Sequence, residues 1–213
     1  MNMKRFLTLS LVMFFLASLS ATAQTAYSGI KGGLNFPSLA SDDGDYDDNM
    51  KIGFHAGFFS KMEISELVAL QPELLYSLKG IKIDYDESAI ADGSSKFNLH
   101  YIDLPVKLVL NFSDYIDLQF GPYVSYLVAA DIDNDADIFD GIEVDGTDEL
   151  DRDQFNKFDY GLTVGIGFDL DPLILGVNYN LGLNPVAKDD QLARDILGDA
   201  KNSTIMLSAG LKF

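Results

Sequence analysis

The feature that most constrains the fold of this chain is a strict alternation of apolar residues with small or polar ones. In the segment 158–170 (FDYGLTVGIGFDL), every second residue from Phe158 to Leu170 is apolar, and the residues between them are Asp, Gly or Thr. An amphipathic helix would instead place apolar residues three and four positions apart. The segment is therefore predicted to be a β-strand with one apolar and one polar face.

The same period of two recurs along the chain. Seven further segments show it, the last two most clearly: 27–36, 50–61, 67–83, 97–112, 116–130, 173–184 and 204–213. Eight strands of roughly ten or more residues result, each long enough to cross a bilayer at a tilt near 45°. Pro72, Pro105 and Pro122 fall inside these strands and are expected to mark bulges or local breaks in pairing.

The connections between the predicted strands alternate in length. Short turns lie at 62–66, 113–115 and 171–172, and long polar loops lie at 37–49, 84–96, 131–156 and 185–202. Outer-membrane barrels have this asymmetry, with short periplasmic turns and longer outer loops. The sequence therefore predicts an all-β fold, an eight-stranded antiparallel up-and-down transmembrane β-barrel, with both ends of the barrel domain on the periplasmic side.

The composition of the polar face separates a membrane barrel from a soluble, lipocalin-like barrel, which is the alternative. This face is dominated by Gly, Asn and Ser, which suit the narrow interior of an eight-stranded barrel. The apolar face carries Phe158 and Phe168 near opposite ends of one strand, as expected for aromatic girdles at two membrane interfaces. Both observations favour a lipid-facing outer wall.

The first residues predict export. Lys4 and Arg5 precede an apolar run at 6–19, and Ala21-Thr22-Ala23 forms a small-x-small cleavage site. This order is typical of a secretory signal peptide. A retained membrane anchor is the alternative, but the apolar run is short for a membrane-spanning helix. We expect a cleaved signal peptide at 1–23 and a barrel domain at 24–213.

Charge and cysteine content exclude several kinds of protein. The formal charge is −18, and removal of 1–23, which holds two cations and no acids, makes it −20. So acidic a chain lacks the basic surface that nucleic-acid binding requires. The absence of cysteine excludes disulfides and thiolate metal sites. No cofactor is expected.

The polar face also carries charges of both signs, which the alternation places inside the barrel. Glu73 and Lys107 lie on adjacent predicted strands at similar depth, so we expect them to form an ion pair, because an unpaired buried charge is costly. A polar conduit and a salt-bridged plug are the two interpretations, and a barrel of this size favours the plug. The remaining interior charges are Lys31, Lys51, Lys61, Lys79, Lys212, Asp103, Asp117, Asp159 and Asp169.

Five segments together resemble the outer membrane protein β-barrel domain family, whose members are usually labelled porin family proteins. They are LQPELLYSLKG at 70–80, HYIDLPVKL at 100–108, QFGPYVSYL at 119–127, NYNLGLNPV at 178–186 and STIMLSAGLKF at 203–213. The resemblance implies an eight-stranded barrel in a Gram-negative outer membrane and implies no particular reaction. It also implies that Phe213 is the terminal aromatic residue presented to the barrel assembly machinery.

The long loops are strongly acidic. The segments 42–48, 84–95, 131–153 and 185–200 hold 24 of the 33 acidic residues. Asp131, Asp133, Asp135 and Asp137 suggest a calcium loop, but Ala136 and Ile142 replace the glycine and the glutamate of an EF-hand. We expect a solvated acidic surface, with weak binding of divalent cations as the alternative.

No catalytic constellation is evident, so the chain is not expected to be an enzyme. The only histidines are His55 and His100, and no G-x-S-x-G motif is present. A site formed by His100 with Asp84, Asp86 or Asp92 is the enzymatic alternative. We expect a monomeric outer-membrane protein with a structural or surface-interaction role through its acidic loops. A narrow, cation-preferring passive channel is the second interpretation, and a soluble ligand carrier is the last.

Overall fold

The computed structural model describes residues 25–40, 51–87, 91–138, 142–149, 155–188 and 199–213. In the described ranges it contains nine strands and no helix that could cross a membrane. The strands are β1 (Thr25–Ala40), β2 (Gly53–Glu63), β3 (Val68–Glu87), β4 (Ala91–Asn111), β5 (Ile116–Ile138), β6 (Ile142–Glu149), β7 (Phe158–Leu170), β8 (Leu173–Pro185) and β9 (Lys201–Lys212).

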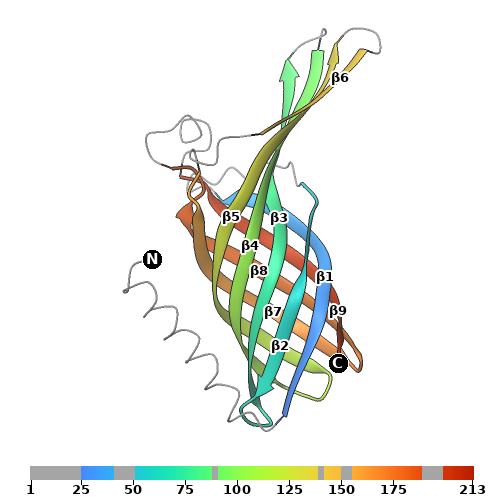
Figure 1. The fold of residues 1–213 in the computed structure, drawn as a ribbon, viewed down its shortest axis with the longest axis vertical. Coiled ribbons are helices and arrows are strands. Elements are labelled where there is room, and N and C mark those ends of the chain that lie inside the picture. Colours follow the sequence, from blue (N-terminus) through green and yellow to red (C-terminus); the bar gives the residue numbers. More distant parts are fainter. Residues whose placement is uncertain (1–24, 41–50, 88–90, 139–141, 150–154, 189–198) are drawn as a thin grey trace, which may run out of the picture.

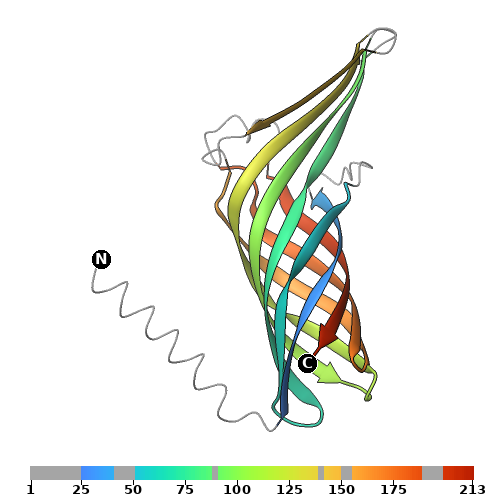
Figure 2. The ribbon, with the colours of Figure 1, turned by 45° about the vertical axis from the view of Figure 1, so that its right-hand side comes forward.

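Eight of these strands close into a barrel. The antiparallel order is β4-β3-β2-β1-β9-β8-β7-β5, and a β4–β5 pairing completes the ring (Figure 1). The prediction of an eight-stranded up-and-down barrel is confirmed. The turns at 64–67, 112–115 and 171–172 lie at the same end as the C-terminus (Figure 2). The predicted signal peptide at 1–23 lies outside the described residues.

Two of the predicted loops are largely strand, and this is the main correction to the sequence analysis. At 84–96, β3 continues to Glu87 and β4 begins at Ala91; at 131–156, β5 continues to Ile138 and pairs with β6. Residues 80–87, 91–98, 131–138 and 142–149 thus extend the sheet beyond the barrel as a four-stranded projection, here called the tower (Figure 1). The many aspartates predicted loops because Asp is depleted in strands, but pairing with neighbouring strands outweighs this weak preference.

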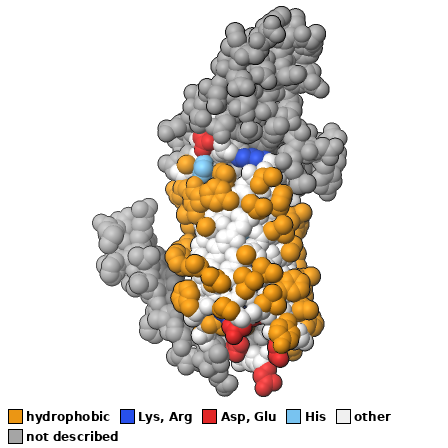
Figure 3. Space-filling model, turned by 90° about the vertical axis from the view of Figure 1, so that its right-hand side faces the viewer, with side chains coloured by type: hydrophobic (Ala, Val, Ile, Leu, Met, Phe, Trp, Pro, Cys, Tyr) orange, Lys and Arg blue, Asp and Glu red, His pale blue; other side chains and the backbone are white. Residues whose placement is uncertain are grey.

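The outer wall of the barrel is apolar. In β7, and in β8 as far as Asn184, the exposed side chains alternate with less exposed ones, and the exposed set includes Leu162, Val164, Ile166, Val177 and Tyr179. Figure 3 shows hydrophobic side chains over the barrel wall, with acidic side chains at its lower end. Such a band is what lipid contact requires.

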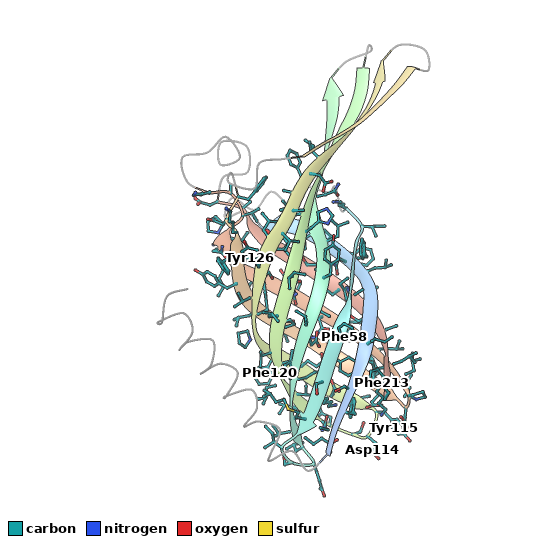
Figure 4. The ribbon with its side chains drawn as sticks, viewed as in Figure 1. Phe58, Asp114, Tyr115, Phe120, Tyr126 and Phe213 are labelled. Atoms are coloured by element: carbon teal, nitrogen blue, oxygen red, sulfur yellow. The ribbon has the colours of Figure 1, made fainter. Side chains whose placement is uncertain are left out.

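Aromatic residues mark both ends of this band. Tyr126 and Phe158 form a tilted ring pair towards the tower, with 5.2 Å between their ring centroids. Tyr115 and Phe213 lie at the opposite end, near Asp114 (Figure 4). The two groups match the interfacial girdles of outer-membrane barrels.

The three strand prolines cause local breaks in pairing without a change of register. The β2–β3 ladder is interrupted opposite Pro72, the β3–β4 ladder opposite Pro105, and the β4–β5 ladder opposite Pro122. A proline has no N–H to donate, so these gaps follow directly. The one bulge between β4 and β5 lies elsewhere, between His100 and Tyr101.

The apolar wall predicts that a charged substitution destabilises the barrel more when it lies deeper in the membrane. Val164 lies in the middle of β7 and Leu170 at its periplasmic end, and the two side chains are equally exposed. Val164→Arg should lower the free energy of unfolding by about 2–4 kcal/mol, and Leu170→Arg by about 0–1 kcal/mol, because only the first places a charge in hydrocarbon. Urea unfolding in lipid vesicles measures both, and equal losses would contradict the assignment of the lipid-facing band.

Candidate functional site

The interior of the barrel is filled with charged and polar side chains. Of the eleven charges that the alternation placed inside, nine are buried, and only Lys212 and Asp169 at the periplasmic rim are partly exposed. Ten of these charges come from seven of the eight barrel strands, and Lys51 lies two residues before β2. They point inward because each strand turns every second residue towards the lumen. The lumen is therefore the first candidate site.

The central layer of the lumen is built around Glu73. Its carboxylate lies 2.9 Å from Lys107 Nζ and 3.0 Å from Lys31 Nζ, and Gln71 donates a hydrogen bond to it at 2.7 Å. The structure thus brings together the expected pair, Glu73 and Lys107, and adds a second lysine. Lys107 also donates to Gln119 and to Asn178 at 3.2 and 3.3 Å, so the layer links β1, β3, β4, β5 and β8.

Two further charged layers lie towards the periplasmic end. Lys61 Nζ is 3.0 Å from the carboxylate of Asp117. At the rim, Lys212 Nζ lies 2.6 Å from Asp169 and 3.3 Å from Asp171, and the hydroxyl of Tyr27 donates to Asp169 at 3.1 Å. Each interior lysine in these layers therefore has a carboxylate partner.

On the outer side of the central layer lies a mixed aromatic and ionic layer. Lys79 Nζ is 3.1 Å from Asp103 and lies 4.9 Å and 5.2 Å from the ring centroids of Tyr101 and Tyr123. Asp159 accepts hydrogen bonds from Tyr123 at 3.3 Å and from Asn202 at 2.9 Å. One oxygen each of Asp103 and Asp159 has no partner among the described residues.

An apolar cluster closes the outer mouth. Phe155, Val186 and Ala187 pack against four inward side chains of β4 and β5, namely Leu99, Tyr101, Leu127 and Ala130. Below the cluster, two lumen cavities have volumes of about 20 and 10 Å³, each enough for roughly one water molecule. The described part of the lumen is packed with side chains.

The two histidines have different surroundings. His55 is buried in the lumen, where its ring nitrogens lie 2.8 Å from Asn35 Oδ1 and 2.9 Å from Ser208 Oγ. His100 lies on the outward face, with Nε2 2.7 Å from Asp131 Oδ1. The structure thus gives His100 a carboxylate partner other than those expected, Asp84, Asp86 and Asp92, whose side chains lie outside the described part. No group of three or more potential metal ligands occurs in the described residues.

Phe213 directly follows β9 at the periplasmic rim. Its side chain is 80% exposed, and its backbone N–H donates to the carbonyl of Ser28 at 2.8 Å. The terminal residue is therefore held in the β1–β9 ladder while its ring remains accessible.

A closed barrel with an apolar outer wall, two aromatic girdles and short turns at the end that carries the C-terminus defines an outer-membrane β-barrel protein. A family model described as outer membrane protein beta-barrel domain matches residues 22–188, and the chain belongs to this family. The match includes β1 to β8 and ends before β9. The resemblance found in the sequence is confirmed, as is the outer-membrane location of the class.

Comparison with solved structures finds other small barrels. Ail, the attachment invasion locus protein of Yersinia pestis, is 17% identical with a TM-score of 0.46, over 89% of this chain and 100% of Ail. Neisserial surface protein A is 12% identical with a TM-score of 0.48, over 89% of this chain and 100% of that protein. OprG from Pseudomonas aeruginosa is 13% identical with a TM-score of 0.32, over 90% and 97%. No curated protein matches the chain.

The central layer predicts a large effect of a small substitution. Glu73→Gln removes one negative charge and leaves Lys31 and Lys107 buried without a counter-ion, so unfolding should become easier by about 3–5 kcal/mol. Asp171→Asn, at the exposed rim partner of Lys212, should change stability by less than about 0.5 kcal/mol. Urea titration in lipid vesicles gives both values.

A triple variant tests the physical cause. Lys31→Met, Glu73→Leu and Lys107→Met together remove all three charges and should restore most of the stability lost in Glu73→Gln, because no buried charge is left unpaired. If the triple variant were less stable than Glu73→Gln, charge pairing would not be the reason for the loss.

Proposed function

We propose that this chain is a non-enzymatic surface protein of the outer membrane that binds a cationic partner through its tower. The observation that carries the proposal is the register of the tower strands. Directly paired positions in β3, β4, β5 and β6 share one face of the sheet, and acidic residues occupy ten of the sixteen positions on one face. Two of the other positions are Lys82 and Lys96.

The alternation within β5 and β6 makes the two faces chemically different. Asp131, Asp133, Asp135 and Asp137 share the acidic face, whereas Ile132 and Ile138 occupy positions of the opposite face. On β6, Ile142 and Val144 fall on the same face as these isoleucines. The arrangement supports a sheet with one charged and one apolar side, which is a common form of recognition surface.

Like charges meet across the β5–β6 pairing. Asp131 pairs with Glu149, Asp135 with Asp145, and Asp137 with Glu143. Directly opposed like charges destabilise a sheet, and a bound cation would relieve this repulsion. A basic polypeptide is the partner we favour, with weak binding of divalent cations by the same carboxylates as the second, subordinate proposal.

The packed lumen supports this role over a passive channel. The charged layers are paired, and the apolar cluster at the outer mouth lies over them. These observations support a function at the ends of the barrel. At the periplasmic end, the accessible ring of Phe213 suits recognition by the barrel assembly machinery.

The hypothesis of a passive channel is tested by recording the current across a planar bilayer that contains the protein. We expect no step conductance from correctly inserted protein, because the two cavities in the described part of the lumen are each close to the size of one water molecule. Protease protection of the barrel strands verifies insertion in the same preparation. Cation-selective steps that shrink in an Asp133→Asn/Asp135→Asn variant would overturn this expectation and establish the channel.

The tower is tested with a defined cationic probe, an octalysine peptide, on protein held in zwitterionic nanodiscs. Asp133→Asn/Asp135→Asn should weaken binding several-fold, because two carboxylates leave the acidic face. The matched control, Glu66→Gln/Asp114→Asn, removes two exposed acids from the periplasmic turns and should leave binding unchanged. Equal losses in both variants would show that net charge alone attracts the peptide.

Salt composition separates the two cation classes in the same assay. Magnesium chloride should reduce octalysine binding more than sodium chloride of equal ionic strength if divalent cations occupy the tower carboxylates. Equal reductions would leave general screening as the only effect.

A further inference from the structure

A polar group lies on the lipid-facing side of the barrel at the base of the tower. Tyr76 of β3, His100 of β4 and Asp131 of β5 form a hydrogen-bonded row across three strands. The Tyr76 hydroxyl lies 2.5 Å from His100 Nδ1, and His100 Nε2 lies 2.7 Å from Asp131 Oδ1. Asn98 donates to the second oxygen of Asp131 at 2.7 Å. We call Tyr76, His100 and Asp131 the rim triad.

The rim triad points away from the lumen. Tyr76 is 37% exposed and follows the same alternation as Leu74, which faces lipid, while its neighbours Leu75 and Ser77 are buried. The side chains of His100 and Asp131 are 21% and 23% exposed. Ionisable side chains are expensive in hydrocarbon, so a histidine–aspartate pair on this face marks the level of the lipid headgroups.

Local backbone irregularities position the triad. The β4–β5 register shifts by one residue between His100, which pairs with Ala129, and Tyr101, which pairs with Leu127. Gly80, which pairs with Asn98 at the same level, has a φ of 127°, a conformation that favours glycine. Bulges of this kind re-aim side chains and are frequent beside binding sites.

The chemistry of the triad selects one kind of headgroup. Phe54, Tyr76 and His100 form a ladder of rings with 5.9 Å between successive centroids. The negative faces of aromatic rings attract the C–H groups of a sugar ring, and the carboxylate of Asp131 accepts hydrogen bonds from sugar hydroxyls. A phosphate headgroup would meet the negative charge of Asp131 and of the acidic face above it.

We propose that the rim triad, together with Phe54, binds the sugar headgroup of a glycolipid in the outer leaflet. The ring ladder lies against the sugar, and Asp131, oriented by His100 and Asn98, accepts its hydroxyl groups. The site shares Asp131 with the acidic face of the tower, but its recognition of a sugar does not depend on the cationic partner proposed there. It adds a lipid-specific contact at the level where the barrel emerges from the membrane.

The same girdle provides an internal control. Tyr126 and Phe158 form a ring pair at the tower end of the barrel, and both side chains are exposed. Among the described residues, no carboxylate forms a hydrogen bond with either ring. Any lipid that merely surrounds the barrel should contact this pair as often as it contacts Tyr76.

The test uses the folded protein in phosphatidylcholine nanodiscs doped with a monoglucosyl diacylglycerol. Intermolecular NOEs between glucosyl protons and the rings of Tyr76 and His100 should exceed those at Tyr126 and Phe158. Asp131→Asn should reduce the NOEs at Tyr76 about fivefold, the size expected for one lost charge-assisted hydrogen bond, and leave those at Tyr126 unchanged. Tyr126→Leu, the matched control, should leave the NOEs at Tyr76 intact.

Two results would overturn the proposal. Equal NOEs at the two ring pairs would show non-specific contact, and a signal at Tyr76 that is insensitive to Asp131→Asn would show that the carboxylate does not recognise the sugar. In the Asp131→Asn variant, the NOEs at Tyr126 report that the barrel is folded, so loss of structure is distinguished from loss of binding. Doping with phosphatidylglycerol in place of the glucolipid should produce no excess contact at the triad.

Discussion

The closed ladder of backbone hydrogen bonds is the constraint on which the rest of this structure depends. Lipid offers no partner to an unpaired N–H or C=O group, so the strands must close, and here the β4–β5 pairing completes the ring. Eight strands make a barrel whose interior is just wide enough for side chains. Every inward residue therefore enters a crowded space with little water, and every inward charge must find a partner there.

That requirement explains how charge is distributed over the molecule. The buried interior charges are five lysines, Lys31, Lys51, Lys61, Lys79 and Lys107, and four acids, Glu73, Asp103, Asp117 and Asp159. Because this interior is close to neutral, the large negative charge of the chain is concentrated in the segments beyond the barrel. The membrane-spanning part therefore carries little net charge.

The sequence predicts most of this arrangement, because the alternation of apolar and polar residues indicates both where the strands lie and which side chains point into the barrel. It places Glu73 and Lys107 at similar depth on neighbouring strands, where the structure has them 2.9 Å apart. It does not find Lys31 beside Glu73, because β1 and β3 are separated by β2 and meet only across the lumen of the closed barrel. Contacts across the lumen depend on barrel width and strand tilt, which alternation does not encode.

The strands of the tower were not predicted from the sequence, for a different reason. Its strands are rich in aspartate, and aspartate predicts loops, yet the segment DIDNDADI at 131–138 has the same period of two as the barrel strands. Periodicity was the better guide there than composition, because the hydrogen-bonded neighbours β4 and β6 supply what intrinsic preference lacks.

One residue decides which way the acidic face of the tower points. Below the bulge, the odd-numbered residues of β5, such as Tyr123 and Ser125, are buried in the lumen. Val128 is the extra residue of the bulge, and beyond it the even-numbered residues point inward instead: Ala129 is exposed and Ala130 is buried.

A shift of one residue moves every following position to the other face of a sheet. Asp131 thereby lies on the outward side of the sheet, where it reaches His100 at the base of the tower, and positions 133, 135 and 137 share its face of the sheet. Without the bulge, the same alternation would place these positions on the face that continues the lumen side of the barrel wall. A single inserted residue thus decides which face of the tower continues the lipid-facing wall of the barrel.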